Sequence, residues 1–198
     1  MSGYTNFAIV GAGVISSYIV TQLLKDKASG TVKDVVVLTR QVCEFIQHVV
    51  HGNLSKLLSS ALKIKGSNTT VQGDAKAIQV DYSNDESIKH ALTGVDVVIS
   101  TVPMTALDVQ GKIAAAAKEA GVKLFVPSEF GGITKDDSKD IRGVKAKVQG
   151  QLRDLGMPYT AFYTGPFPDY IWASYVFDLP LNFGDSVHLT KEFKDLRP

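Results

Sequence analysis

The sequence has almost no cysteine and no excess of charge of either sign. Its 198 residues include one cysteine, Cys43, which excludes a disulfide within the chain and is typical of a reducing compartment. The 21 Lys and Arg residues are balanced by 20 Asp and Glu residues, so the basic character of proteins that bind nucleic acid or anionic membranes is missing. We therefore expect neither a direct nucleic-acid partner nor a membrane partner.

Long apolar runs are absent as well. No stretch reaches the roughly 20 residues of a transmembrane helix, and no basic segment precedes the first apolar run as it would in a signal peptide. These absences predict a cytoplasmic protein. With 44% hydrophobic and 21% charged residues, the composition is that of an ordinary globular domain.

A glycine turn near the start organises the rest of the chain. Phe7–Val10 is a short apolar run typical of a buried strand, and apolar residues at helical spacing follow it. Gly11 permits a tight turn between the two, and Gly13 leaves space for a pyrophosphate at the N-terminus of the helix. The third glycine of this dinucleotide-binding pattern is replaced by Ser16, and a plain buried strand-turn-helix is the alternative. The candidate cofactor-binding residues of the turn are Gly11, Gly13, Val14 and Ile15.

Alternation of apolar runs with helical segments predicts the fold class. It is typical of an α/β domain with a doubly wound parallel sheet, here a Rossmann NAD(P)-binding domain over residues 1–164. The expected strands are Phe7–Val10, Val35–Leu38, Ala77–Val80, Val95–Ser100, Val122–Val126 and Tyr159–Tyr163. Helices are expected from Val14, from a capping box of Ser83 with Glu86, over Ala106–Ala120, and over Ile141–Leu155.

Several residues follow the expected strands at the edge where α/β sheets bind ligands. Arg40 ends the second strand, where an acidic residue would bind the ribose 2′-hydroxyl of NAD and an arginine can pair with the 2′-phosphate of NADP. Arg40 therefore favours NADP(H), although a solvated arginine is the alternative. The other candidates at this edge are Asp81, Thr101, Val102, Pro103 and Ser128.

Residues 41–66 interrupt the alternation. Their apolar periodicity predicts two amphipathic helices separated by a turn at Gly52. Cys43, His48 and His51 fall within them, but their spacing matches no zinc signature and the ligand set is incomplete. We expect no metal site.

The composition changes again over residues 165–198, where aromatic residues and prolines are frequent. These residues either pack as apolar surface against the sheet or form one wall of a pocket for an aromatic or apolar substrate. We treat them as the start of a substrate-binding region.

Six segments carry a family likeness in the same order along the chain. They are Val10–Ile15, Leu38–Arg40, Val80–Tyr82, Phe125–Gly131, Val144–Val148 and Met157–Thr160. Together they resemble the NmrA-like / isoflavone reductase-like family of atypical short-chain dehydrogenases. The resemblance covers most of residues 5–177 apart from 41–66. It implies NADP(H) as cofactor and the reduction of a small aromatic or apolar substrate.

By this resemblance, Lys145 corresponds to the catalytic lysine of the family and also lies beside the cofactor. Such a lysine can orient the nicotinamide ribose and help a proton reach the reduced substrate. A solvated helix lysine is the alternative, and Lys147 is the internal comparison. The Tyr-x-x-x-Lys pair of typical short-chain dehydrogenases is absent, and Arg142 stands where the family usually has an aromatic residue.

The resemblance leaves two functions open, and a chain that is neither enzyme nor sensor is a third possibility. The first is an NADPH-dependent oxidoreductase that transfers a hydride to a small molecule. The alternative is a non-catalytic NADP(H)-sensing regulator that binds a protein partner, as the namesake of the family does. The family pattern also implies a longer chain, so we expect residues 165–198 to begin a C-terminally truncated substrate region and residues 41–66 to be an insert.

Deleting Val42–Lys65 tests the expectation that this segment is an insert. Soluble expression and NADPH binding should be retained or improved in the deletion variant. A long surface insertion changes the entropy cost of folding only slightly, and an uncovered apolar face on it would promote association. Size-exclusion chromatography and fluorescence titration with NADPH measure both properties. A deletion variant that fails to fold would show that the segment is integral.

Overall fold

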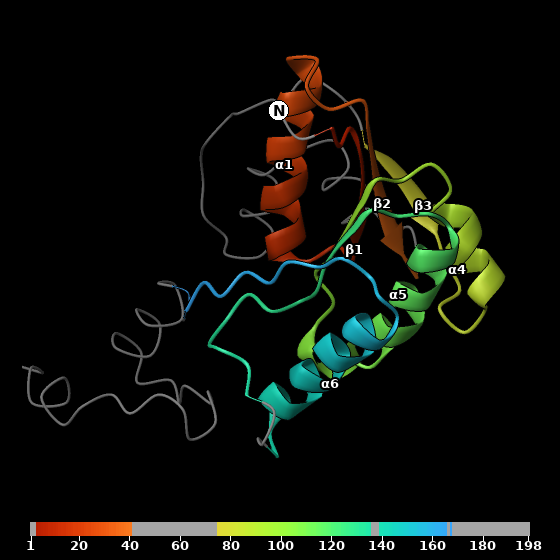
Figure 1. Ribbon diagram of the computed structural model, residues 1–198. Coiled ribbons are helices and arrows are strands. Elements are labelled where there is room, and N and C mark those ends of the chain that lie inside the picture. The colour runs from red at the N-terminus through yellow and green to blue at the C-terminus, as the bar shows by residue number, and fades with distance from the viewer. Residues whose placement is uncertain (1–2, 41–74, 136–138, 166, 168–198) are drawn as a thin grey trace, which may run out of the picture.

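The computed structural model describes residues 3–40, 75–135, 139–165 and 167, and these form a five-stranded parallel sheet (Figure 1). The spatial order is β3-β2-β1-β4-β5, so the chain starts in the middle of the sheet and crosses over to fill both sides. The strands are β1 (Asn6–Val10), β2 (Asp34–Thr39), β3 (Lys76–Gln79), β4 (Val97–Ser100) and β5 (Leu124–Val126).

Helices cover both faces of the sheet, as the buried positions of β1 show. Ile9 packs with Val20 and Leu24 of the first helix on one face, whereas Ala8 and Val10 belong to the core on the other face. The helices are α1 (Val14–Ala28) on the first face, and α4 (Asp85–Ala91), α5 (Val109–Glu119) and α6 (Ile141–Asp154) on the second, with the short 3-10 helix η1 (Met104–Ala106) before α5.

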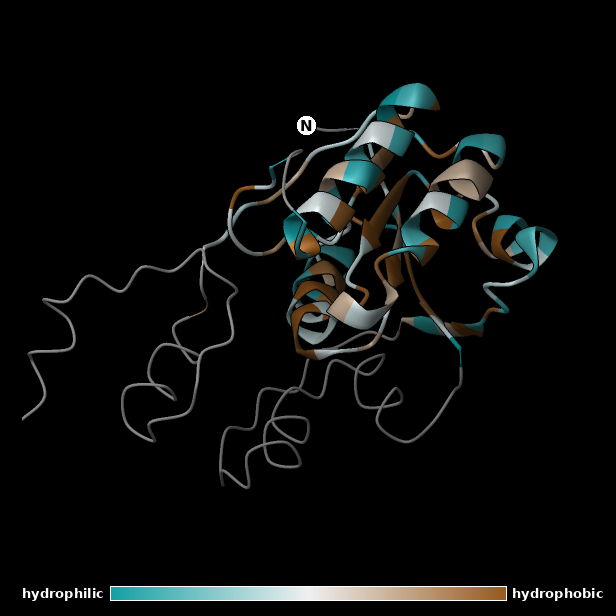
Figure 2. Cartoon of the chain, turned by 90° about the horizontal axis from the view of Figure 1, so that it is seen from below, coloured by the Kyte–Doolittle hydropathy of each residue, from teal (hydrophilic) through white to brown (hydrophobic). Residues whose placement is uncertain are grey.

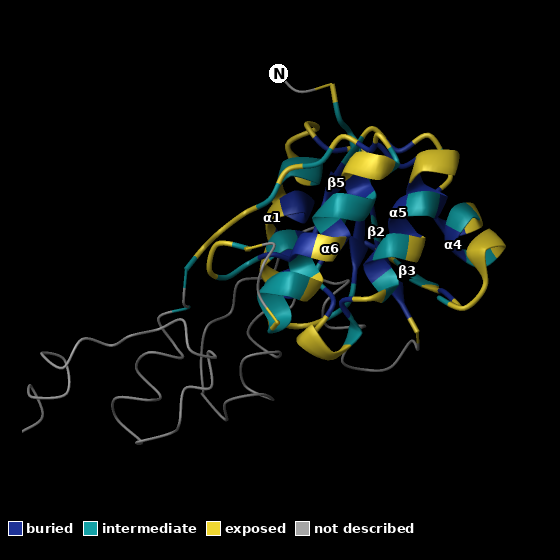
Figure 3. Ribbon diagram, turned by 60° about the horizontal axis from the view of Figure 1, so that its bottom comes forward, coloured by how far each residue is buried: buried dark blue, intermediate teal, exposed yellow. Residues whose placement is uncertain are grey.

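The layering confirms the predicted doubly wound α/β fold. Apolar strands lie between helices whose polar residues face outward (Figure 2). Buried residues gather in the interior between the helices (Figure 3), and they form two clusters, one on each side of the sheet. Among the described residues, no helix is long and apolar enough to cross a membrane.

The predicted sixth strand is wrong. Of Tyr159–Tyr163, only Tyr159 pairs with the sheet, through a single bridge to Phe125. The physical reason is the length of β5, which offers three residues for pairing before Pro127 follows. Beyond the bridge, the side chains of Phe162 and Tyr163 are exposed.

The predicted capping box at Ser83 is also wrong, by one residue. Asn84 is the N-cap of α4, and its side-chain oxygen accepts hydrogen bonds from the backbone N–H groups of Glu86 and Ser87. Ser83 is occupied elsewhere, because its N–H and hydroxyl both donate to Asp81. The helix expected from Ala106 begins instead as η1 and continues as α5 from Val109.

Several expectations lie outside the described residues. They include the two helices over residues 41–66 with Cys43, His48 and His51, and nearly all of residues 165–198. The domain division at residue 164 therefore stays a prediction. Within the described ranges, no cluster of three His, Cys, Asp or Glu residues could hold a metal ion.

The Asp96 carboxylate joins the amino ends of three strands. One oxygen accepts hydrogen bonds from the backbone N–H groups of Thr5 and Asn6, both at 2.9 Å, at the start of β1. The other oxygen binds the Lys123 ammonium at 2.7 Å, just before β5. These contacts hold the pKa of Asp96 well below its usual range, with the Lys123 hydrogen bond as the largest cause and burial opposing it. Asp96 therefore stabilises the fold in its charged form.

Asp96→Asn should lower the free energy of unfolding at neutral pH by about 1–3 kcal/mol, because hydrogen bonds to a charged acceptor are lost. The pKa of Asp96 is depressed in the folded state, so its stabilisation is complete above the unfolded pKa and is lost as the pH falls below about 4. Urea denaturation of both proteins across this pH range measures the effect.

The exposed carboxylate of Asp154, at the end of α6, supplies the matched control. Asp154→Asn should leave stability nearly unchanged at every pH. An Asp96→Asn protein as stable as wild type at neutral pH would contradict the assigned role.

Candidate functional site

Because all five strands are parallel, their carboxyl ends meet at one edge of the sheet, where open α/β sheets bind ligands. The sequence-predicted site residues follow these strand ends. Gly11 follows β1, Arg40 follows β2, Thr101 follows β4 and Ser128 lies two residues after β5. Asp81 comes two residues after β3 at the same edge.

The turn after β1 requires glycine at its first position. Gly11 has a φ of 101°, and a Cβ atom placed on it would lie 3.1 Å from both the carbonyl oxygen and Oγ1 of Thr101. Thr101 is itself fixed by its N–H and hydroxyl, which donate to the Val10 carbonyl at 2.8 and 2.9 Å. The turn and the end of β4 are therefore packed backbone against backbone.

Gly13 has a different role, because nothing lies within 4 Å of a Cβ placed on it. It is the N-cap of α1, which has no side-chain cap and no acidic residue in its first turn. Val14 is exposed and Ile15 half-buried beside it. No side chain caps the first N–H groups of this 15-residue helix, and the space beside Gly13 is open, which is an arrangement that accepts an anion.

Ser16 explains how the turn tolerates the missing third glycine. The residue is completely buried, and its hydroxyl donates to the Gly13 carbonyl at 2.7 Å. A small side chain with a satisfied hydroxyl lets α1 pack closely against the sheet.

Arg40 lies at an open pocket of about 370 Å³ that continues along the end of β3. The Asp81 carboxylate in this pocket accepts hydrogen bonds from the side chain and backbone of Ser83, which lower its pKa. Burial raises the pKa of Tyr82 to about 12, and the nearby Arg40 charge opposes this. The Tyr82 hydroxyl is buried and has no hydrogen-bond partner within the described part of the chain.

The loops after β4 and β5 are fastened to each other by Ser128. Its hydroxyl donates to the Val102 carbonyl at 2.9 Å, and its N–H donates to Oε1 of Gln110 at 2.8 Å. Gln110, on α5, is 1% exposed and was not among the sequence candidates. Pro103, the next residue after Val102, is exposed at the edge. Ser128 therefore positions the loops that surround the site.

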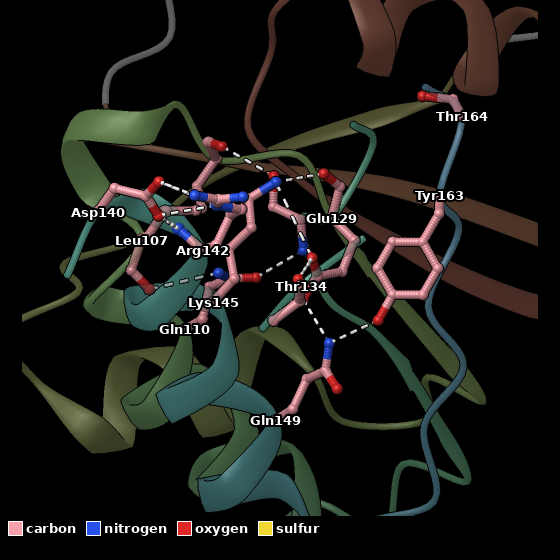
Figure 4. Close-up of polar contacts among 12 residues, drawn as sticks. Leu107, Gln110, Glu129, Thr134, Asp140, Arg142, Lys145, Gln149, Tyr163 and Thr164 are labelled. Atoms are coloured by element: carbon pink, nitrogen blue, oxygen red, sulfur yellow. Dashed lines mark hydrogen bonds and ion pairs between the residues drawn. The ribbon is translucent and has the colours of Figure 1, made fainter. Parts of the chain in front are cut away.

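Lys145 extends from α6 toward the loop after β5 (Figure 4). Its ammonium donates to the Glu129 carbonyl oxygen and lies 3.9 Å from Oε2 of the Glu129 carboxylate. Burial lowers the pKa of Lys145, and the Glu129 charge opposes the shift. Lys147, two residues later, is exposed. The two lysines of this helix therefore differ in burial, and the catalytic role of Lys145 stays a prediction.

Glu129 was missed by the sequence analysis, although it lies within a quoted motif. Its side chain is 1% exposed, and both carboxylate oxygens have hydrogen-bonding partners. Oε2 accepts from the Thr134 hydroxyl at 2.5 Å, and Oε1 accepts from the Gln149 amide at 2.8 Å. A buried glutamate needs such partners, but they come from distant positions that no local pattern marks.

Comparison with known proteins identifies a family. The sequence model of the NmrA-like family matches residues 6–186. The chain is 43% identical over 96 residues to phenylcoumaran benzylic ether reductase Pyrc5 of Pyrus communis, covering 46% of this chain and 31% of that protein. It is 41% identical over 99 residues to isoflavone reductase of Glycine max, covering 47% and 31%. The matched segment thus spans about a third of the length of these relatives.

Solved structures share the fold. The AtPrR2 complex with NADP+ and (+)pinoresinol superposes with a TM-score of 0.62 at 23% identity, covering 88% of this chain and 54% of that one. The NADPH-dependent quinone oxidoreductase QOR2 of Escherichia coli gives a TM-score of 0.59 at 20% identity, covering 85% and 50%.

Proposed function

Because the chain belongs to the NmrA-like family, we propose that it is an NADPH-dependent oxidoreductase of the isoflavone reductase-like type. Its substrate would be a small aromatic or apolar molecule that accepts a hydride. The observation that carries the proposal is the half-buried Lys145, held at the same sheet edge as the glycine turn. A substrate of this class suits the reductase names of the curated relatives.

The residues after β1 and β2 fit a dinucleotide phosphate. The uncapped N-terminus of α1 and the open space at Gly13 suit a pyrophosphate, which needs backbone N–H donors and close approach. Arg40, at the pocket beyond β2, suits the additional 2′-phosphate of NADP(H). The Tyr82 hydroxyl near Arg40 is a further donor for an anion that reaches this pocket.

NADPH supplies a hydride when bound, and the protein must then manage the matching proton. Lys145 is the candidate, because an ammonium has three N–H donors and the Glu129 carbonyl accepts from it here. Another N–H can orient the nicotinamide ribose or give a proton to a substrate oxygen as negative charge develops there. Burial of the lysine favours this proton release, because it disfavours the charged form.

The regulatory alternative requires cofactor binding without turnover. The half-buried placement of Lys145 favours catalysis, since a sensor needs no proton donor at the nicotinamide. We further propose a cytoplasmic location, in keeping with the single cysteine.

Cofactor preference provides the first test. NADPH should bind at least about ten-fold more tightly than NADH, because a charge-assisted contact to the 2′-phosphate contributes about 1.5–3 kcal/mol. Arg40→Ala should remove most of this preference, as measured by fluorescence titration with each cofactor. The control is Lys33→Ala, which removes an exposed cation next to β2 at its amino end. An unchanged affinity ratio in Arg40→Ala would contradict the assignment.

Turnover provides the second test. NADPH consumption should be detectable with a member of a panel of aromatic ketones and enones, and Lys145→Ala should lower it by about two orders of magnitude. Lys147→Ala, on the same helix but exposed, should have little effect. Equal behaviour of the two variants would refute the role of Lys145, and NADPH binding without turnover on the whole panel would favour the regulator.

A further inference from the structure

We propose that Glu129 is the positioning residue of the site, and that its buried carboxylate holds the Lys145 side chain in place in its protonated form. The effect on catalysis rests on the proposed function, whereas the effect on Lys145 itself does not. Glu129 touches Lys145 directly and has no assigned role in the glycine turn or the Arg40 pocket.

The backbone around Glu129 aims its side chain inward. The Glu129 N–H donates to the Pro127 carbonyl at 2.8 Å, which makes a tight turn directly after β5. The next residue, Phe130, has a φ of 20°, the single positive value among the described non-glycine residues. This turn directs the side chain of Glu129 under the loop and away from solvent. Only 1% of the side chain is exposed.

Two hydrogen bonds that do not involve Lys145 fix the Glu129 carboxylate. The Thr134 hydroxyl approaches it from the loop, and the Gln149 amide approaches it from α6 (Figure 4). Gln149 also donates to the Tyr163 hydroxyl at 2.9 Å, which ties it to the segment after α6. Because each oxygen accepts a hydrogen bond from a different element, the carboxylate is held in one orientation and its charge at a defined point.

Lys145 meets Glu129 through both the backbone and the side chain of the same residue. The carbonyl oxygen accepts a hydrogen bond from the ammonium, and the carboxylate lies 3.9 Å from it. Gly131 lies beside this contact, where a Cβ would be 3.3 Å from the Glu129 carbonyl oxygen, so a side chain there would crowd the acceptor of the hydrogen bond. A flexible lysine side chain loses rotamer freedom in such a contact, and its ammonium is thereby placed for ligand contact.

Electrostatics sets the protonation of the lysine. Burial, the larger cause, lowers the pKa of Lys145, and the Glu129 charge raises it. The other titratable groups around it in Figure 4 are Tyr163, bonded to Gln149, and Asp140 with Arg142, whose charges pair at 2.7 Å. Removal of the Glu129 charge leaves burial unopposed, so the ammonium should lose its proton at lower pH.

Glu129→Gln tests the proposal, with Glu119→Gln on α5 as the matched control because Glu119 is an exposed glutamate. In Glu129→Gln, kcat should fall about 10- to 100-fold, the scale expected for a misplaced catalytic group. The alkaline limb of the pH profile of kcat should move to lower pH, and the affinity for NADPH should stay within about two-fold, which a general loss of structure would not allow. The control should match wild type in all three measurements.

A direct titration keeps this test independent of turnover. NMR of isotope-labelled lysine side chains follows the titration midpoint of Lys145, assigned by its loss in Lys145→Ala. The midpoint should be lower in Glu129→Gln than in wild type and unchanged in Glu119→Gln. If wild type lacks turnover but the midpoint moves as expected, the proposed function fails and the role of Glu129 stands. An unmoved midpoint overturns the role of Glu129, whatever the activity.

Glu129→Asp serves as the conservative variant, and it also replaces the glutamine variant if that protein does not fold. Aspartate retains the negative charge, but its side chain is one methylene shorter, so the carboxylate lies farther from Lys145. Its Lys145 midpoint and its kcat should lie between those of wild type and Glu129→Gln. Values equal to wild type in both measurements would show that the reach of the carboxylate does not matter, and would overturn the proposal.

Discussion

The Asp96 carboxylate fixes the amino ends of the central strands, and the position of the candidate site follows from that constraint. It binds the start of β1 through two N–H groups and the segment before β5 through Lys123. In the sheet, Phe7 of β1 pairs with Val97 of β4, and Val97 pairs with Leu124 of β5, so these three strands begin in register. Strands of similar length that begin in register also end together, so Gly11, Thr101 and the loop after β5 meet at the opposite edge.

Asp96 and Glu129, the two buried carboxylates among the described residues, serve different purposes. Asp96 binds backbone N–H groups and a lysine whose side chain is 58% exposed, so its charge remains close to solvent. Glu129 is 1% exposed and pairs with a lysine that is 14% exposed. A buried ion pair of this kind is a weak source of stability, because desolvation offsets the attraction. Its position at the edge of the candidate site is better explained by the placement of the lysine than by stability.

Local patterns were sufficient for the fold and for the position of the glycine turn in the candidate site. The period of apolar residues located β1 to β5, and the glycine spacing located the turn, because both depend on neighbours within a few residues. Burial of Glu129 depends on Thr134, Lys145 and Gln149, which lie 5, 16 and 20 residues away. Gln110 likewise meets Ser128 across 18 residues. The false strand at Tyr159–Tyr163 has the same origin, since pairing depends on the length of β5.

Arg142, the departure from the family pattern nearest to Lys145, is explained by the start of α6. Asp140 caps this helix by accepting the backbone N–H of Arg142 at 2.7 Å, and its carboxylate also binds the Arg142 side chain. The arginine charge is therefore compensated within the same turn, by an acid at 2.7 Å. Lys145 lies one helical turn farther along, where Glu129 is the charge that opposes the effect of burial on its pKa. A cation at position 142 is thus compatible with a protonated Lys145 because its own partner comes from the helix cap.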